Sequence, residues 1–162
     1  MANSFKILKD TYEYVEVLIK CDGSATSAAT LIDADTLVDY DSSVPNSSDI
    51  QLRFFSANFN LSGKGDASSS KSGGVVTLLR NHQTTDVDII TLTGNGAINF
   101  SPSLPVEAPS GGESATNFNG DINYTVGAET VGHVTVVFHK ASGYLYSHRK
   151  FRKPTQANPY PS

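Results

Sequence analysis

Hydrophobic residues recur at every second position over most of this chain, and this spacing constrains the fold more than any other feature. In an extended segment over residues 12–20, Val15, Val17 and Ile19 lie on one side of the chain. A period of two, carried by β-branched and aromatic residues, is typical of a β-strand with one face in a core. The other segments with this spacing are 49–61, 75–80, 87–93, 97–100, 121–126 and 133–139.

Turn-forming residues separate these segments. Gly94, Asn95 and Gly96 predict a hairpin turn, because Gly and Asn tolerate a positive φ. Residues 64–74 predict a flexible loop, and three prolines within 101–118 exclude a regular element there. No segment shows the pattern of an amphipathic helix of three turns. We therefore expect an all-β fold, a β-sandwich or jelly-roll-like domain of seven to nine short strands, with a closed barrel as the alternative.

Three segments leave more than one interpretation open. Residues 25–41 are ambiguous: 30–32 fits a short strand, and 33–41 fits either a turn or one helical turn capped by Asp33. Residues 140–143 predict a turn. Residues 144–151 fit either a last strand or the start of a C-terminal arm.

The size of the chain predicts one folded domain, because 162 residues are enough to bury a core. We place this domain at residues 1–146. Cys21 is the only cysteine, so no disulfide can form within the chain, as is usual in a reducing compartment. We interpret Cys21 as a small apolar residue at a strand end. No stretch approaches the ~20 apolar residues of a membrane helix, and we expect no membrane partner.

The last sixteen residues, 147–162, differ from the rest in charge. They contain four of the twelve Lys and Arg and none of the sixteen Asp and Glu, so residues 1–146 carry eight bases against sixteen acids, a net charge of −8. We interpret 147–162 as a basic, extended arm that contacts a partner protein, with a disordered solubilising tail as the alternative. The residues that we expect to contact a partner are Arg149, Lys150, Phe151, Arg152, Lys153 and Tyr160 in the arm, and Phe5, Ile7 and Leu8 at the N-terminus.

Reaction chemistry has little support in the sequence. His133 and His139 are six residues apart on one predicted strand and can share a face, but two histidines do not make a usual zinc site. Neither a nucleophile elbow nor a His-Glu-x-x-His motif occurs. Gly63-Lys64-Gly65 is not followed by a helix, so it is not a phosphate-binding loop. We expect no cofactor and no enzymatic activity.

Two further binding classes were weighed. Four aspartates, Asp33, Asp35, Asp39 and Asp41, allow a calcium-binding loop, although the order of an EF-hand loop is not met. The basic arm is the one segment suited to nucleic acid, and the acidic body opposes that use, so we expect no nucleic-acid partner.

Two stretches carry a resemblance to a known group of proteins. These are 72–80, a Gly-rich turn leading into a Val-Thr-Leu strand, and 84–100, where a Thr-Thr-Asp turn precedes an apolar strand and a Gly-Asn-Gly turn. Together with Gly120-Asp121-Ile122, they resemble small β-rich structural proteins in the virions of tailed, particularly marine, bacteriophages. The resemblance covers about a third of the chain, roughly 72–100 and 118–139. Residues 144–162 depart from it, because members often stop soon after the last strand.

The resemblance implies a virion structural protein, most simply a capsid decoration or cement protein. Its expected partners are the major capsid protein or neighbouring virion subunits, with the protein itself a homo-oligomer or bound to the lattice. Its expected location is the virion, assembled in the host cytoplasm. The alternative is a tail, fibre or adsorption component that binds a host surface glycan through the loops at 62–74 and 101–118. An enzyme such as a small hydrolase is the third class.

Overall fold

The computed structural model describes residues 2–43, 50–63, 74–83, 85–100 and 118–145. Over these residues the chain forms nine β-strands and one short 3-10 helix, so the prediction of an all-β fold is confirmed. The elements are β1 Ser4–Asp10, β2 Tyr14–Asp22, β3 Thr26–Ile32, η1 Ala34–Thr36, β4 Gln51–Gly63, β5 Val75–His82, β6 Val87–Thr93, β7 Asn95–Asn99, β8 Phe118–Val126 and β9 Thr130–Ser142. None of the described helical segments is long and apolar enough to cross a membrane.

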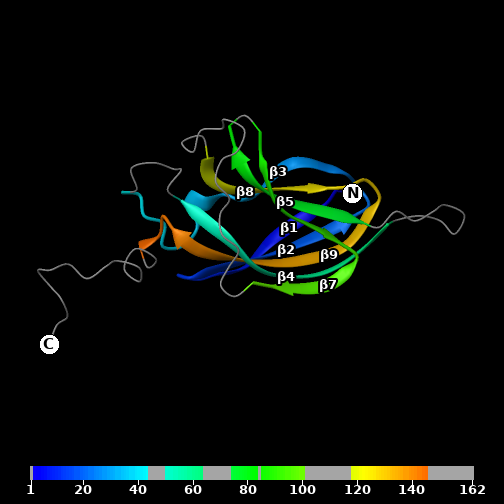
Figure 1. Ribbon diagram of the computed structural model, residues 1–162, viewed down its shortest axis with the longest axis horizontal. Coiled ribbons are helices and arrows are strands. Elements are labelled where there is room, and N and C mark those ends of the chain that lie inside the picture. Colours follow the sequence, from blue (N-terminus) through cyan, green and yellow to red (C-terminus); the bar gives the residue numbers. More distant parts are fainter. Residues whose placement is uncertain (1, 44–49, 64–73, 84, 101–117, 146–162) are drawn as a thin grey trace, which may run out of the picture.

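The strands form two antiparallel sheets. Sheet A has the order β1-β2-β9-β4-β7, and sheet B has the order β3-β8-β5-β6. Figure 1 shows them as two layers, with β3, β5 and β8 above the strands of sheet A. Each sheet ends in two edge strands rather than closing on itself. The fold is therefore a β-sandwich and not a closed barrel.

The core lies between the two sheets and follows the predicted alternation. In β2, Val15, Val17 and Ile19 are fully buried, while the residues between them are only half-buried. The same alternation places further core residues on the facing strands: Leu52, Phe54, Val76, Leu78, Ile122, Tyr124, Val126, Val134, Val136 and Phe138. The ring of Phe54 meets that of Phe138 edge-on, with the ring centres 6.0 Å apart. Burial of the inner, apolar faces of the two sheets holds the sandwich together, since the chain has no disulfide.

A β-bulge changes the alternation within β4. Its pairing with β9 shifts between Phe54 and Ser56. Phe54 is buried before the shift and Ala57 after it, so the intervening Phe55 and Ser56 stay half-buried. A bulge inserts one extra residue and redirects the side chains that follow it. As a result, Ala57 rather than Ser56 is the next residue to face the core, while Phe55 lies on the outer face of sheet A, as simple alternation after Phe54 requires.

Several boundaries differ from the sequence prediction. Residues 4–10 form a strand that was not predicted, and β3 begins at Thr26 rather than at residue 30. The predicted turn at 140–143 is wrong, because β9 continues to Ser142. Residues 34–36 form the one helical turn that was the alternative for this region; Asp33 is its N-cap but makes no side-chain capping hydrogen bond.

The predicted hairpin at Gly94-Asn95-Gly96 is also wrong. β6 belongs to sheet B and pairs with β5, whereas β7 belongs to sheet A and pairs with β4. Gly94 has a φ of +71°, as a tight turn requires, but the chain uses it to cross from one sheet to the other. The turn chemistry was recognised correctly, and the partner of the following strand was not.

Candidate functional site

The exposed edge strand β1 is the candidate functional site. β1 pairs with β2 on one side, from Ser4 opposite Lys20 to Asp10 opposite Val15. Its first six residues are all exposed. Phe5, Ile7 and Leu8 are 45%, 40% and 47% exposed, which is unusual for three large apolar residues within four positions. The structure thus brings together the three N-terminal residues that the sequence predicted as partner contacts.

The side chains of β1 divide between the two faces of sheet A. Phe5 lies opposite the buried Ile19, and Ile7 opposite the buried Val17, so both point to the core side of the sheet. Phe5 reaches the ring of Tyr124 in sheet B, with ring centres 5.9 Å apart. Both residues nevertheless remain partly open to solvent, because β1 is the outermost strand of its sheet.

Both ends of β1 are fixed by polar side chains. At its start, the Asn3 side chain donates to the Ser24 carbonyl (2.7 Å) and to the Thr26 hydroxyl (2.8 Å), and it accepts from the Asp22 amide (3.0 Å). These bonds join β1 to the loop that leads from β2 to β3. The start of the strand is therefore held by side-chain contacts in addition to the ladder.

The far end of β1 is fixed by a buried ion pair. The Lys140 ammonium, whose side chain is 0% exposed, donates to Asp10 Oδ1 (2.5 Å) and to the carbonyls of Thr11 (2.6 Å) and Val38 (2.7 Å). Asp10 Oδ2 accepts from the Val38 amide (2.8 Å). All three Lys140 donors are satisfied, as a buried charge requires. Sequence reasoning placed Lys140 in a turn, although continuing the alternation past Phe138 puts it on the core side.

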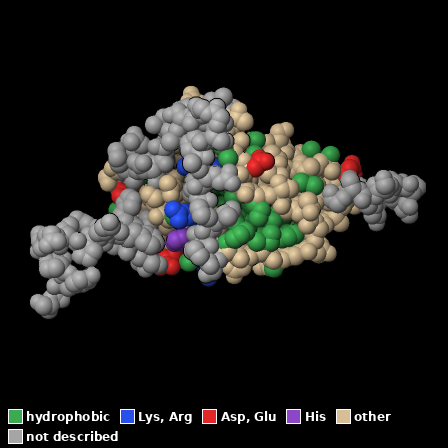
Figure 2. Space-filling view, viewed as in Figure 1, with side chains coloured by type: hydrophobic (Ala, Val, Ile, Leu, Met, Phe, Trp, Pro, Cys, Tyr) green, Lys and Arg blue, Asp and Glu red, His purple; other side chains and the backbone are tan. Residues whose placement is uncertain are grey.

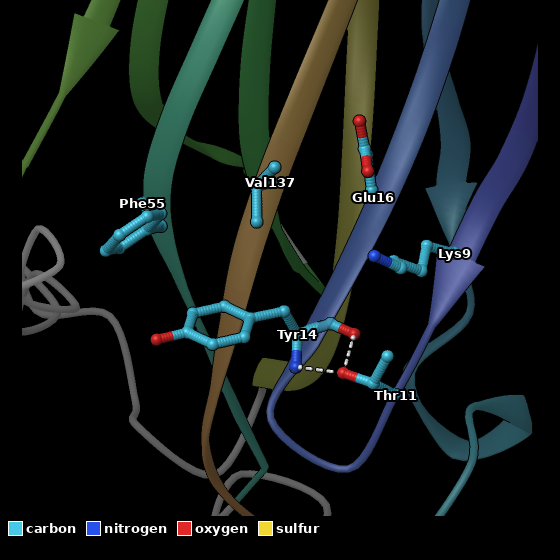
Figure 3. Close-up of a pocket in the computed structure, with 6 residues that line it drawn as sticks. All are labelled: Lys9, Thr11, Tyr14, Glu16, Phe55 and Val137. Atoms are coloured by element: carbon cyan, nitrogen blue, oxygen red, sulfur yellow. Dashed lines mark hydrogen bonds between the residues drawn. The ribbon is translucent and has the colours of Figure 1, made fainter.

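Two shallow grooves lie on the outer face of sheet A next to β1. The first, of about 340 Å³, is bounded by Ser4, Phe5, Lys6, Leu8, Leu18 and Lys20. The second, of about 370 Å³, reaches across four strands and is bounded by Lys9, Thr11, Tyr14, Glu16, Phe55 and Val137 (Figure 3). The side chains of Tyr14 and Phe55 lie together, with ring centres 5.3 Å apart, and Tyr14 is also 5.3 Å from the ring of His139. The alternation in the sequence puts Phe55 on the outer face, but it did not predict this aromatic pair, because Tyr14 and Phe55 meet only when β9 lies between β2 and β4.

Hydrophobic side chains also gather on the side of the molecule where β4 and β7 lie, as Figure 2 shows. The partly buried residues of β4, β6 and β7 that pack on the core are Phe59, Ile89, Ile90 and Ile98. Because these residues contact the core, this area is the margin of the hydrophobic interior rather than a separate feature.

The arm residues Arg149, Lys150, Phe151, Arg152, Lys153 and Tyr160 lie outside the described residues, as do most of the loops at 62–74 and 101–118. Chain geometry is described up to Leu145. Tyr144, at the base of the arm, is fully buried, and its hydroxyl donates to the Ala34 carbonyl (2.9 Å). The body of the domain thus extends at least to this tyrosine.

Three histidines, His82, His133 and His139, belong to the described residues. His133 and His139 both lie on the outer face of β9, as expected from their spacing. His82 is 4% exposed and packs against the ring of Phe118, with ring centres 4.6 Å apart. No three His, Cys, Asp or Glu side chains among the described residues could hold a metal ion, and the calcium-loop alternative at 33–41 gains no support.

Asp33 and Cys21 have shifted pKa values. A hydrogen bond with Asp35, burial and the neighbouring Asp121 together raise the pKa of Asp33 to about 6. Burial and the charge of Asp22 raise the pKa of the Cys21 thiol to about 11. Cys21 is 7% exposed and belongs to the core, in agreement with its interpretation as a small apolar residue. A buried thiol with a raised pKa is a poor nucleophile.

Comparison with protein-family models, with curated proteins and with solved structures found no match for this chain.

Proposed function

We propose that this protein is a structural protein of a bacteriophage virion, a capsid decoration or cement protein that binds the head lattice. Its β-sandwich would lie on the shell, and its termini would contact neighbouring subunits or the major capsid protein. The observation that carries the proposal is the edge strand β1, which is held at both ends and exposes Phe5, Ile7 and Leu8. The resemblance of 72–100 and 118–139 to virion proteins supports a virion structural protein, and it favours no particular place within the virion.

The physical basis of such binding is multivalency. Three partly exposed apolar side chains on the two faces of one edge strand give a weak contact when that strand acts alone. A lattice presents many copies of the same site, and a second contact through the basic arm then occurs at high effective concentration. Weak contacts at β1 and at 147–162 would then act together and raise the occupancy above what either contact gives alone.

A non-enzymatic role fits the described side chains best. The one described cysteine is buried with a raised pKa, which makes its thiol a poor nucleophile. The proposal therefore assigns no cofactor, and assigns neither nucleic acid nor membrane as a partner.

Electron microscopy of virions with and without this protein tests the proposal. We expect density for the protein on the head surface, which disappears when its gene is deleted. Density on the tail alone would overturn the decoration role. Phe5→Ser/Ile7→Ser and a deletion of residues 147–162 should each lower the occupancy of the head lattice, while Tyr12→Ser, at an exposed residue of the β1–β2 turn, should not.

One observation favours the alternative, a tail or adsorption component that binds a host glycan. The second groove offers the adjacent rings of Tyr14 and Phe55, which are tilted by 56° to each other, and Lys9 and Glu16 also line it (Figure 3). Aromatic rings with a few polar groups nearby are typical of small-molecule sites. A glycan array that gives hits with the native protein and none with Tyr14→Ala/Phe55→Ala would favour this function.

A further inference from the structure

We propose that β1 accepts an acidic, extended segment of the partner protein as an additional strand of sheet A. This inference rests on the proposed function, because it specifies the chemistry of the segment that the lattice would contribute. Strand addition to an exposed sheet edge is a general mode of protein recognition, in which main-chain hydrogen bonds give affinity and alternate side chains give specificity.

Within the part of the chain that the structure describes, the edge of β1 that faces away from β2 has no neighbouring strand, and the pairing of β1 with β2 shifts register between Ile7 and Lys9. β1 is the terminal strand of sheet A, and β2 is its only neighbour among the described strands. Since β1 hydrogen-bonds on one side, the main-chain groups that point away from β2 are left for another strand. At the opposite edge of sheet A, β7 has five residues rather than seven, and Ile98, its large apolar residue, packs on the core.

The strand is already ordered in the form that a partner needs. The Asn3 side chain holds its start through three hydrogen bonds, and Asp10 holds its end through the Lys140 ammonium and the Val38 amide. Binding then orders only the incoming segment, which lowers the entropic cost of association. A strand fixed in this way serves as a preformed template for an added strand. It is not suited to domain swapping with a second copy, because moving β1 away would leave the Lys140 charge buried and unpaired.

An added strand would find apolar surface on both faces of sheet A. Phe5 and Ile7 offer partly exposed surface on the core side, and Leu8 does so on the outer side, where it bounds the first groove. Successive side chains of an extended segment point to opposite faces, so a single segment can contact both surfaces.

The charges next to β1 select the type of segment. Lys6 and Lys9 lie on β1, and Lys20 lies on β2 opposite Ser4. Among the described side chains, the ion pair is formed by Lys140 and Asp10, and Lys6, Lys9 and Lys20 form no ion pair. On β2, Glu16 lies opposite Lys9 and Asp22 follows Lys20 by two positions, and on β1 Asp10 is committed to Lys140. The edge strand β1, the one that an added segment would pair with, therefore presents the positive charges of Lys6 and Lys9, on a body at 1–146 whose net charge is −8.

These lysines also disfavour two other occupants. Pairing of β1 with β1 of a second copy would place four lysines on one two-stranded ladder, and like charges across a ladder are destabilising. The arm at 147–162 carries four bases and would be repelled in the same way. Lysines on an edge strand are a common protection against self-association, and here they leave an acidic segment as the favourable partner.

Binding of a seven-residue peptide of alternating glutamate and valine to the full-length protein tests this inference. We expect the peptide to bind and to slow amide hydrogen exchange along β1, measured by NMR. The variant Lys6→Glu/Lys9→Glu should bind this peptide about tenfold more weakly, because two attractions become repulsions. The same variant should gain affinity for the matching peptide of alternating lysine and valine, and this gain would also show that the variant is folded.

Three results would overturn the inference: no binding at about 1 mM glutamate–valine peptide, equal affinities of the two proteins for it, or slowed exchange at β7 instead of β1. None of them bears on whether the protein decorates the head. The proposed function fails separately, if particles examined without any peptide lack the protein on the head surface. Head density that is insensitive to Lys6→Glu/Lys9→Glu would overturn strand addition alone.

Discussion

A lysine side chain is rarely fully buried unless its charge is compensated, and Lys140 meets this condition at the end of β9. The Asp10 carboxylate and the carbonyls of Thr11 and Val38 accept from its ammonium, whose nitrogen is also 5.0 Å from the centre of the Tyr144 ring. Asp10 lies 130 positions away in the sequence. This single residue thus ties the N-terminal edge strand to the last strand of the same sheet.

We predict that Asp10→Ala lowers the free energy of unfolding by about 3–5 kcal/mol, because it leaves the Lys140 ammonium buried without its counter-charge. Asp10→Ala/Lys140→Met should be more stable than Asp10→Ala alone, since no unpaired charge then remains. Urea unfolding followed by circular dichroism measures both, with the exposed Lys9→Ala as a control expected within about 0.5 kcal/mol of the native protein. A loss of less than 1 kcal/mol in Asp10→Ala would contradict the role of the ion pair in holding β1.

Asp33 should make stability depend on pH. Its pKa is raised from 3.8 to about 6 in the folded protein, so the folded state binds this proton more tightly than the unfolded state does. Protonated Asp33 therefore stabilises the folded protein: this contribution is complete below pH 3.8 and is lost as the pH rises through about 6. Asp33→Asn removes the titration, so we predict that its stability relative to the native protein is higher at pH 7 than at pH 4.5. Denaturant unfolding of Asp33→Asn and of the native protein at both pH values gives the difference between their free energies of unfolding. The same difference at pH 4.5 and at pH 7 would contradict the prediction.

At the scale of elements, β9 and β4 approach very closely at Gly132. Gly132 has a φ of +125°, and a Cβ atom there would lie 1.9 Å from the Asn60 carbonyl oxygen. A glycine at this point in the sequence usually marks a turn. The structure instead places it within β9, where the missing side chain lets the backbone of the neighbouring strand pass.

We predict that Gly132→Ala lowers the free energy of unfolding by about 3 kcal/mol, from the strained φ and the overlap with the Asn60 backbone together. Gly94→Ala is the matched control, because Gly94 also has a positive φ, of +71°, but has open space around its Cβ position. It should cost only about 1–2 kcal/mol. Thermal unfolding of the two variants separates the contributions, and equal losses would show that the close approach to Asn60 carries no energy of its own.

The strands were predictable where local pattern alone determines them, as in β2 and β6. Their partners were not, because a hairpin turn and a crossing between sheets use the same residues, here Gly94 and its neighbours. β1 was missed because its exposed residues show no burial pattern, even though Phe5, Ile7 and Leu8 were singled out as contacts. The second groove was missed for another reason: Tyr14 and Phe55 meet only after three strands and a bulge have been placed.

For the molecule as a whole, the described tertiary contacts reach from Asn3 to Leu145. Among the described residues, the buried hydrophobic side chains begin at Val15 and end at Tyr144, and Tyr144 is joined to Ala34 by its hydroxyl and to Tyr40 by an isolated β-bridge. These contacts secure the last core residue that the structure describes. A boundary between a domain at 1–146 and an arm at 147–162 therefore stays a prediction with a direct physical test.

We predict that a chain ending at residue 146 keeps its free energy of unfolding within about 0.5 kcal/mol of the full-length value, because every buried residue that the structure describes is retained. A chain beginning at residue 11 should be strongly destabilised, since it lacks Asp10 and leaves the Lys140 charge unpaired inside the sandwich. Thermal and urea unfolding of both truncated proteins measure these effects. If the chain ending at residue 146 loses more than about 2 kcal/mol, the arm packs on its own domain. A fall in lattice occupancy after deletion of the arm could then not be assigned to a lost contact with a neighbouring subunit. An unchanged value makes that assignment valid, and the contribution of β1 must then be measured by point substitutions, because its removal disrupts the fold that presents it.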